Sequence, residues 1–180
     1  TAAARLFSDI KSYMINKDTE KRKSVELVRE FAKEYAWTGK EISGFDQAII
    51  SSEQLRREYE LLRHDRVDLI ITDAPLPLGN IYARAYKLSG VDSIYSITTE
   101  FEECYPSLNI IVRRGDRPFA QAGRYEDEEA AKKMDENIDR YLTTEFYFCG
   151  FTTPVLETDP DSSVPQHEQI FNLVKENLNF

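Results

Sequence analysis

Short apolar runs alternate with longer amphipathic segments along this chain, and this alternation constrains the fold most. The apolar runs have the length of strands: SVELV at 24–28, VDLIIT at 67–72, SLNIIV at 107–112 and TPVLE at 153–157. Apolar residues at helical spacing predict helices between and around them, at 1–16, 46–64, 80–88, within 92–104, at 126–143 and at 164–178. This order predicts a single α/β domain over residues 1–180, with a mostly parallel sheet flanked by helices.

Two local details of this prediction concern helix ends. Asp46 is the expected N-cap of the 46–64 helix, because a carboxylate can accept hydrogen bonds from the first amides of a helix. Residues 74–80 are expected to form a loop, because Pro75 and Pro77 interrupt regular structure. Residues 33–40 remain ambiguous between helix and loop.

Charge and composition exclude several classes of function. The formal net charge is −9, which disfavours binding to duplex nucleic acid because that affinity depends on neutralising phosphates. No apolar run approaches the ~20 residues that a membrane-spanning helix needs. Cys104 and Cys149 lack the spacing of metal ligands, and a zinc site is not expected. These features predict a cytoplasmic protein.

Three candidate residues lie at the C-terminal ends of the predicted strands. Glu30 follows the first strand, Asp73 the second and Arg113 the third. Ligands of parallel α/β folds bind where the carboxyl ends of the strands meet. An Asp at the end of an apolar strand is the Walker B arrangement, in which the carboxylate holds Mg²⁺ beside nucleotide phosphates. The alternative for Asp73 is a turn-capping role before the 74–80 segment.

Four longer segments carry a resemblance to a known family: VELVREFAKEYAW, FDQAIISSEQLRREYELL, DLIITDAPLPLGNIYA and LNIIVRRGDRPFAQAGRYEDEEAAKKMDENIDRYL. Together they resemble P-loop NTPases and kinases, in particular the AAA-type ATPase and kinase proteins of bacteriophages. They are also similar to nicotinamide riboside kinase-like domains and to deoxynucleoside and nucleotide kinases. The resemblance implies a three-layer P-loop kinase-like fold, ATP and Mg²⁺ as cofactors, and the host cytoplasm if the protein is phage-encoded.

The chain departs from this family at its first residue. The family begins with a strand and a GxxxxGK[ST] phosphate loop, and neither precedes the 1–16 helix here. The resemblance implies that Thr1 lies at or just beyond the end of that loop, in contact with the cofactor. It also implies that the first strand would lie between the strands at 67–72 and 107–112, so that its absence leaves two strand edges unpaired.

Arginines gather after the third strand, in a segment at about 113–127 that the resemblance implies is a lid. Their positive charge suits phosphoryl transfer, which needs the charge on the moving phosphate to be neutralised. Arg113 and Arg124 are the catalytic candidates, and Arg114 and Arg117 are candidates for binding substrate. The alternative is a solvated loop whose arginines pair with the acidic run EDEE that follows.

Further substrate-binding candidates lie on the first strand end and on the 46–64 helix. The resemblance implies that Glu30 accepts the proton of the substrate hydroxyl, and Arg29 would bind the substrate phosphate if the substrate is a monophosphate. Gln54 could read the edge of a base through its amide, with Arg57 on the same helix face and Asp46 as a minor ligand candidate. The alternatives are an ordinary helix N-cap or a surface ion pair for Arg29 and Glu30, and a polar helix face for Gln54 and Arg57.

Three functions remain open on the sequence. The first is transfer of the ATP γ-phosphate to a nucleoside, nucleotide or nicotinamide riboside-like small molecule. The second is a kinase that acts on nucleic acid, which the acidic charge disfavours. The third is a binding or regulatory protein that kept the fold without catalysis. A homodimer is compatible with each.

Overall fold

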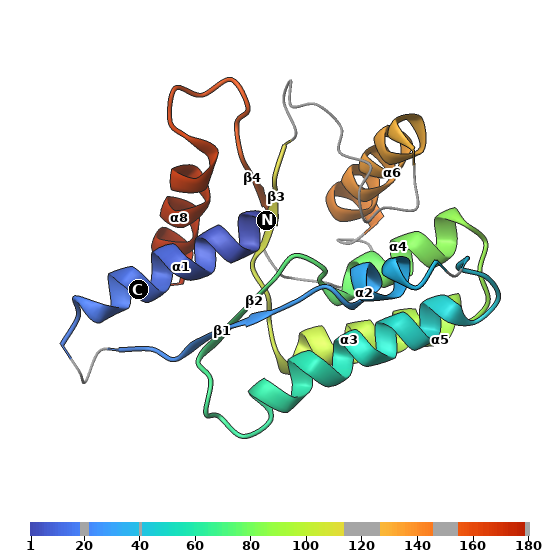
Figure 1. The fold of residues 1–180 in the computed structure, drawn as a ribbon, viewed down its shortest axis with the longest axis horizontal. Coiled ribbons are helices and arrows are strands. Elements are labelled where there is room, and N and C mark those ends of the chain that lie inside the picture. Colours follow the sequence, from blue (N-terminus) through green and yellow to red (C-terminus); the bar gives the residue numbers. More distant parts are fainter. Residues whose placement is uncertain (19–21, 40, 114–126, 146–154, 179–180) are drawn as a thin grey trace.

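The computed structural model describes residues 1–18, 22–39, 41–113, 127–145 and 155–178. Helices and short strands alternate through these ranges (Figure 1). The strands are β1 (Val25–Val28), β2 (Leu69–Thr72), β3 (Asn109–Ile111) and β4 (Val155–Glu157). The helices are α1 (Ala2–Ile15), α2 (Phe31–Trp37), α3 (Asp46–Leu62), α4 (Leu76–Ala85), α5 (Val91–Cys104), α6 (Glu128–Arg140), a π-helical turn at Tyr141–Glu145, and α8 (Gln166–Asn177).

The strands form two separate parallel pairs. β1 pairs with β2, with Val25 opposite Leu69 and Val28 opposite Thr72. β3 pairs with β4, with Asn109 opposite Val155. Among the described residues no strand joins β2 to β3. The prediction of an α/β fold with parallel strands is therefore confirmed, but the strands in the described ranges do not form one continuous sheet.

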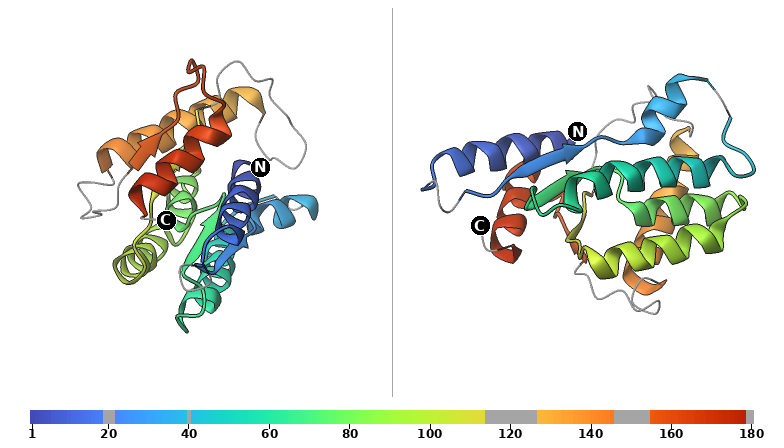
Figure 2. Two further views of the ribbon diagram at one scale, coloured as in Figure 1. Left: turned by 90° about the vertical axis from the view of Figure 1, so that its left-hand side faces the viewer. Right: turned by 90° about the horizontal axis from the view of Figure 1, so that it is seen from below.

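Helices cover both faces of the strands. Buried residues of α1, α8, β1 and β2 form one apolar cluster, against which Ile110 of β3 packs. The next residue of β3, Ile111, packs against a second cluster built from α4, α6 and the π-helical turn. This alternation is expected of a strand, because successive side chains point to opposite faces. Figure 2 shows α1 beside α8, and α3, α4 and α5 together in another layer.

Two helix starts differ from the sequence predictions. The 74–80 segment is not a loop, because α4 begins at Leu76 with Pro75 at its N-cap. Pro77 lies in the first turn, where backbone amides have no partner within the helix and a proline therefore costs no hydrogen bond. At α3 the N-cap is Phe45, and Asp46 is the first helical residue.

Helix α4 packs closely against α3 at Gly79. A methyl group added to Gly79 would lie 2.3 Å from Ser51 Oγ of α3. Only glycine therefore fits this contact without displacing Ser51. The contact fixes α3 beside α4, and α3 carries much of the polar network described below. No helix in the described ranges is both long enough and apolar enough to cross a membrane.

Candidate functional site

The ends of β1 and β2 bring two of the predicted acids to one edge. Val28 and Thr72 are paired residues, so the two strands finish level with each other. Arg29 and Glu30 follow β1, and Asp73 follows β2. The prediction that the residues after these strands share an edge agrees with this register.

Asp73 is half-buried, and its carboxylate makes no hydrogen bond or ion pair within the described part of the chain. The next backbone amide, that of Ala74, donates to Thr72 Oγ1 at 3.1 Å and so turns the chain sharply after β2. Mg²⁺ in phosphate-transfer sites is typically bound by one or two carboxylates together with water and substrate phosphates. An unpartnered carboxylate at this edge fits that requirement. The described residues include no cluster of three or more acidic, histidine or cysteine side chains suited to a metal.

Glu30 lies at the start of α2 and forms an ion pair with Lys33. The distance from Lys33 Nζ to Glu30 Oε2 is 3.2 Å, and both side chains are partly exposed. This is the surface pair that the sequence left open as the alternative for Glu30. A role in accepting a substrate proton would require this contact to loosen, which costs little for an exposed pair.

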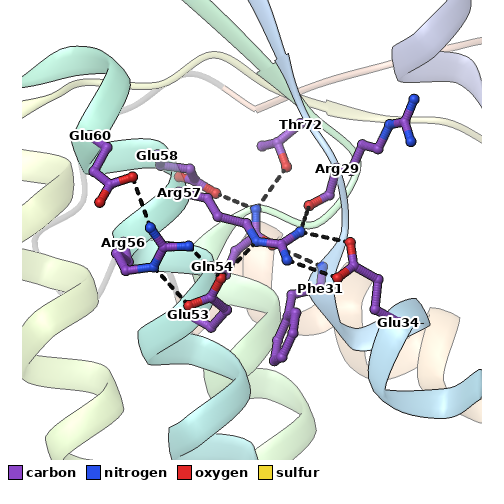
Figure 3. A network of polar contacts seen from close by, with 10 residues as sticks. All are labelled: Arg29, Phe31, Glu34, Glu53, Gln54, Arg56, Arg57, Glu58, Glu60 and Thr72. Carbon is purple, nitrogen blue, oxygen red and sulfur yellow. Dashed lines mark hydrogen bonds and ion pairs between the residues drawn. The ribbon is translucent and has the colours of Figure 1, made fainter. Parts of the chain in front are cut away.

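The Gln54 side chain of α3 forms hydrogen bonds both to the chain that follows β1 and to the last residue of β2 (Figure 3). Its Oε1 accepts a hydrogen bond from the Phe31 amide at 3.2 Å. Its Nε2 donates to Glu58 Oε1 at 2.8 Å and to Thr72 Oγ1 at 3.3 Å. Both amide hydrogens are thus used inside the protein, so reading a base would require these bonds to break. We refer to Phe31, Gln54, Glu58 and Thr72 as the Gln54 cluster.

Glu58 is the titratable member of this cluster. The side chain is buried, with 4% of the residue exposed. Burial raises the pKa of Glu58 to about 7; the hydrogen bond from Gln54 acts against this rise, and the nearby Glu102 adds to it. Glu102 of α5 is also buried, and burial raises its pKa as well, against hydrogen bonding from Ser107. Ser107 Oγ donates to Glu102 at 2.5 Å and accepts from Asn109 Nδ2 at 3.0 Å, which extends the polar contacts to β3.

Arg57 and Arg29 differ in how their charges are used. Arg57 donates to both carboxylate oxygens of Glu34, at 2.9 and 2.8 Å, and packs over the Phe31 ring. The hydrogen bonds to Glu34 raise the pKa of the Arg57 guanidinium above its ordinary value. By contrast, the Arg29 guanidinium points away from the Gln54 cluster and forms no ion pair among the described residues (Figure 3). Arg29 therefore remains available for a substrate phosphate, and Arg57 is already neutralised.

The end of β3 is closed by ion pairs. Arg113 Nε donates to Glu157 at 2.8 Å, and Nη2 contacts both Glu157 and Asp139 of α6, the latter at 2.7 Å. Hydrogen bonds to Glu157, then to Asp139, raise the pKa of Arg113 above its ordinary value. The Arg113 amide donates to Thr158 Oγ1, and Gln166 Nε2 donates to the Arg113 carbonyl. A phosphate would have to compete with two carboxylates for this guanidinium.

The remaining predicted residues have structural contacts or lie outside the described ranges. Asp46 accepts hydrogen bonds from Tyr35 Oη at 2.8 Å and from the Ser43 amide at 2.9 Å. Thr1 caps α1 by accepting from the Ala4 amide at 3.2 Å. Arg114, Arg117, Arg124 and all of the predicted lid except residues 113 and 127 lie outside the described residues.

Sequence reasoning did not identify Glu58, Thr72 or Glu102. The signal for Glu58 was its spacing, because the buried positions of α3 are Gln47, Ile50, Gln54 and Glu58. These four residues lie three or four apart, so they share one helix face. A polar residue in line with Ile50 therefore indicates a buried polar contact. Glu102 carries the same signal on α5, where it follows Ile94 and Thr98 at intervals of four.

A shallow groove of about 330 Å³ lies elsewhere, between α1 and α8. Its lining includes Arg5, Asp9, His167 and Phe171, and it contains none of the strand-end residues. Arg5 and Asp9 pair with each other across one turn of α1 at 3.3 Å. We therefore place the candidate site at the strand ends on chemical grounds rather than in this groove.

Comparison with known proteins gave no relative. No family model, no curated protein and no solved structure matches this chain.

Proposed function

We propose that this protein is an ATP-dependent phosphotransferase that acts on a nucleoside, a nucleotide or a nicotinamide riboside-like small molecule. The observation that supports this most is the edge formed by β1 and β2. Two parallel strands end level there, and they are followed directly by the carboxylate of Asp73, for which the described residues supply no partner. Ligands of parallel α/β folds bind at such edges.

Each residue of this edge has a proposed role. Asp73 holds Mg²⁺, which neutralises charge on the ATP phosphates. Glu30 accepts the proton of the acceptor hydroxyl, and its exposed pair with Lys33 is weak enough to give way. If the acceptor is a monophosphate, Arg29, whose guanidinium points away from the Gln54 cluster, binds its phosphate.

We also propose a P-loop kinase-like fold, on the pairing of the strands and the placement of the helices. In that fold a further parallel strand lies between the strands corresponding to β2 and β3. The four described strands all pair in parallel, β1 with β2 and β3 with β4, and parallel pairing is a property that this fold requires. The helices on both faces of the strands also support a three-layer fold.

A coupled assay for ADP release tests this function. The protein is expressed from its full coding sequence and supplied with Mg²⁺-ATP and, in turn, nucleosides, nucleoside monophosphates and nicotinamide riboside. We expect release above the acceptor-free rate with one of these classes, and Asp73→Asn should abolish it. Absence of release with every acceptor contradicts the proposal. Labelling of an oligonucleotide instead would identify a nucleic-acid kinase.

One observation favours a second candidate, a nucleotide-fold binding protein without catalysis. Arg113 and Arg57, two of the predicted cationic residues, are neutralised by carboxylates of the protein itself. Titration calorimetry separates the candidates. Binding of Mg²⁺-ATP without turnover supports the second, whereas binding with turnover supports the first.

A further inference from the structure

The Gln54 cluster includes the two residues that adjoin the candidate acids in the sequence. Phe31, whose amide donates to Gln54 Oε1, immediately follows Glu30. Thr72, whose hydroxyl accepts from Gln54 Nε2, immediately precedes Asp73. One side chain of α3 therefore contacts both strand ends within one residue of each acid.

Thr72 passes this contact on to the turn that carries Asp73. Its Oγ1 also accepts from the Ala74 amide at 3.1 Å. Asp73 thus lies between Thr72 and Ala74, which are hydrogen-bonded to each other. The acceptor of that bond, Thr72 Oγ1, also accepts from Gln54. Movement of Gln54 would change the position of this turn.

The orientation of the Gln54 amide is determined by its neighbours. The Phe31 amide is a donor and requires the oxygen of Gln54 on its side. The nitrogen must then point toward Glu58 and Thr72, both of which offer acceptors. Gln54 is 5% exposed, so water does not readily replace any of these partners.

We propose that Gln54 is a positioning residue for the carboxylates of Glu30 and Asp73, and that Glu58 holds the Gln54 amide in the required orientation. The inference rests on the proposed function for what the two acids do, but its geometric content can be tested without nucleotide. Gln54 itself touches neither metal nor substrate in this account.

The neighbours of Glu58 make the cluster sensitive to pH. On α3 the hydrogen-bond partner of Glu58 is Gln54, and from α5 the facing charged group is Glu102. The pKa of Glu58, raised by burial to about 7, means that this carboxyl changes its charge near neutrality. When Glu58 is ionised its bond from Gln54 is charge-assisted and stronger.

Amide hydrogen exchange measured by NMR tests the geometry. In Gln54→Ala we expect exchange at the Phe31 amide to accelerate about tenfold, because the variant removes its acceptor. Exchange at the Ala74 amide should accelerate by a smaller factor, because its acceptor Thr72 remains and loses only its own contact with Gln54. The Thr158 amide, which bonds to Ile111 between β3 and β4, serves as the internal reference and should not change. Gln47→Ala is the matched control, because Gln47 is an equally buried glutamine of α3 that lies beside Gly79 instead.

Two further variants keep the test decisive if Gln54→Ala does not fold. Glu58→Gln retains an acceptor for Gln54 but cannot ionise, so the Phe31 amide shift should titrate near pH 7 in the wild type and stay constant in this variant. Thr72→Val should accelerate exchange at Ala74, and Thr72→Ser, which restores the hydroxyl, should return it to the wild-type rate.

The outcomes distinguish this inference from the proposed function. Unchanged exchange at Phe31 and Ala74 in Gln54→Ala, or equal changes in Gln47→Ala, would overturn the positioning role. Local acceleration supports it even if the wild type transfers no phosphate, in which case only the proposed function fails. If the wild type is active, Gln54→Ala should lower kcat by a larger factor than it raises the KM for ATP.

Discussion

The two strand pairs end in opposite electrostatic states. At the end of β1 and β2, Asp73 has no partner among the described residues. Gln54 is hydrogen-bonded to Thr72, which precedes Asp73, and to Phe31, which follows Glu30. At the end of β3 and β4, Arg113 is enclosed by Glu157 and Asp139. Equivalent positions in a parallel fold thus differ: within the described ranges the carboxylate after β2 has no partner, whereas the guanidinium after β3 is paired with two carboxylates.

This difference shows how function can be separated from stability in the fold. Ion pairs near the surface contribute little to stability but keep charges neutral. The half-buried carboxylate of Asp73 gains no hydrogen bond or ion pair from the part of the chain that the structure describes, so a ligand could supply its partner. Substitutions at the two strand ends should therefore affect different measurements.

The largest expected effect is on activity at Asp73. Asp73→Asn removes the carboxylate that we propose as the Mg²⁺ ligand and should lower kcat at least about 100-fold, because loss of charge stabilisation in the transition state has this order of effect. Asp139→Asn at the closed end is the matched control and should change the rate less than about twofold, as expected of a surface charge. Steady-state kinetics of ADP release measure both. Equal losses in the two variants would remove the distinction between the strand ends.

The pH dependence of stability is the next largest effect. The pKa of Glu58 is about 7 in the folded protein, above its ordinary value of 4.5. Between these values the folded state holds more protons than the unfolded state, so the free energy of unfolding falls as pH rises from about 4.5 to about 7. This contribution is fully present below pH 4.5 and is lost above pH 7.

Glu58→Gln should remove that dependence. At pH 8 the variant should be more stable than the wild type by up to about 3 kcal/mol, and at pH 4.5 the two should be similar. Urea unfolding across this pH range measures the difference. A constant difference at all pH values would show that Glu58 does not titrate in the folded protein.

The packing of α3 provides a smaller effect, on stability alone. Gly79→Ala introduces a methyl group 2.3 Å from Ser51 Oγ and should lower the free energy of unfolding by about 1–3 kcal/mol, less the gain from replacing a helical glycine. Ser51→Ala in the same chain removes that oxygen and should restore most of the loss. Thermal unfolding of the two single variants and the double variant measures the coupling. Additive losses would contradict the contact.

The smallest effect is expected at Arg113. Arg113→Met should lower the free energy of unfolding by about 1 kcal/mol, because the pairs with Glu157 and Asp139 are partly exposed. The loss should shrink in high salt. A large fall in kcat with unchanged stability would instead favour the lid role predicted for Arg113 from the sequence.

The elements that local sequence determines were predicted well. All four strands and the helices α1, α3, α5, α6 and α8 lie where the apolar spacing indicated, with shifts at their ends. Helix α4 began earlier than predicted, because a proline in a first helical turn looks the same in sequence as a proline in a loop.

Only part of the candidate site can be recognised in the sequence. Glu30 and Asp73 were named as candidates because an acid at the end of an apolar run is visible there. The hydrogen bonds of Gln54 could not be predicted in this way, since its partners Phe31 and Thr72 lie 23 and 18 residues away along the chain. The closure of Arg113 by Glu157, 44 residues later, was missed for the same reason.

Paramagnetic line broadening by Mn²⁺ in the presence of ATP is the most direct test of an open and a closed strand end. The account predicts that NMR signals of the chain at Asp73 and Glu30 broaden first, while those of Thr158 and Glu157 remain sharp. Broadening first at Glu157 and Asp139, or none at either strand end, would contradict it.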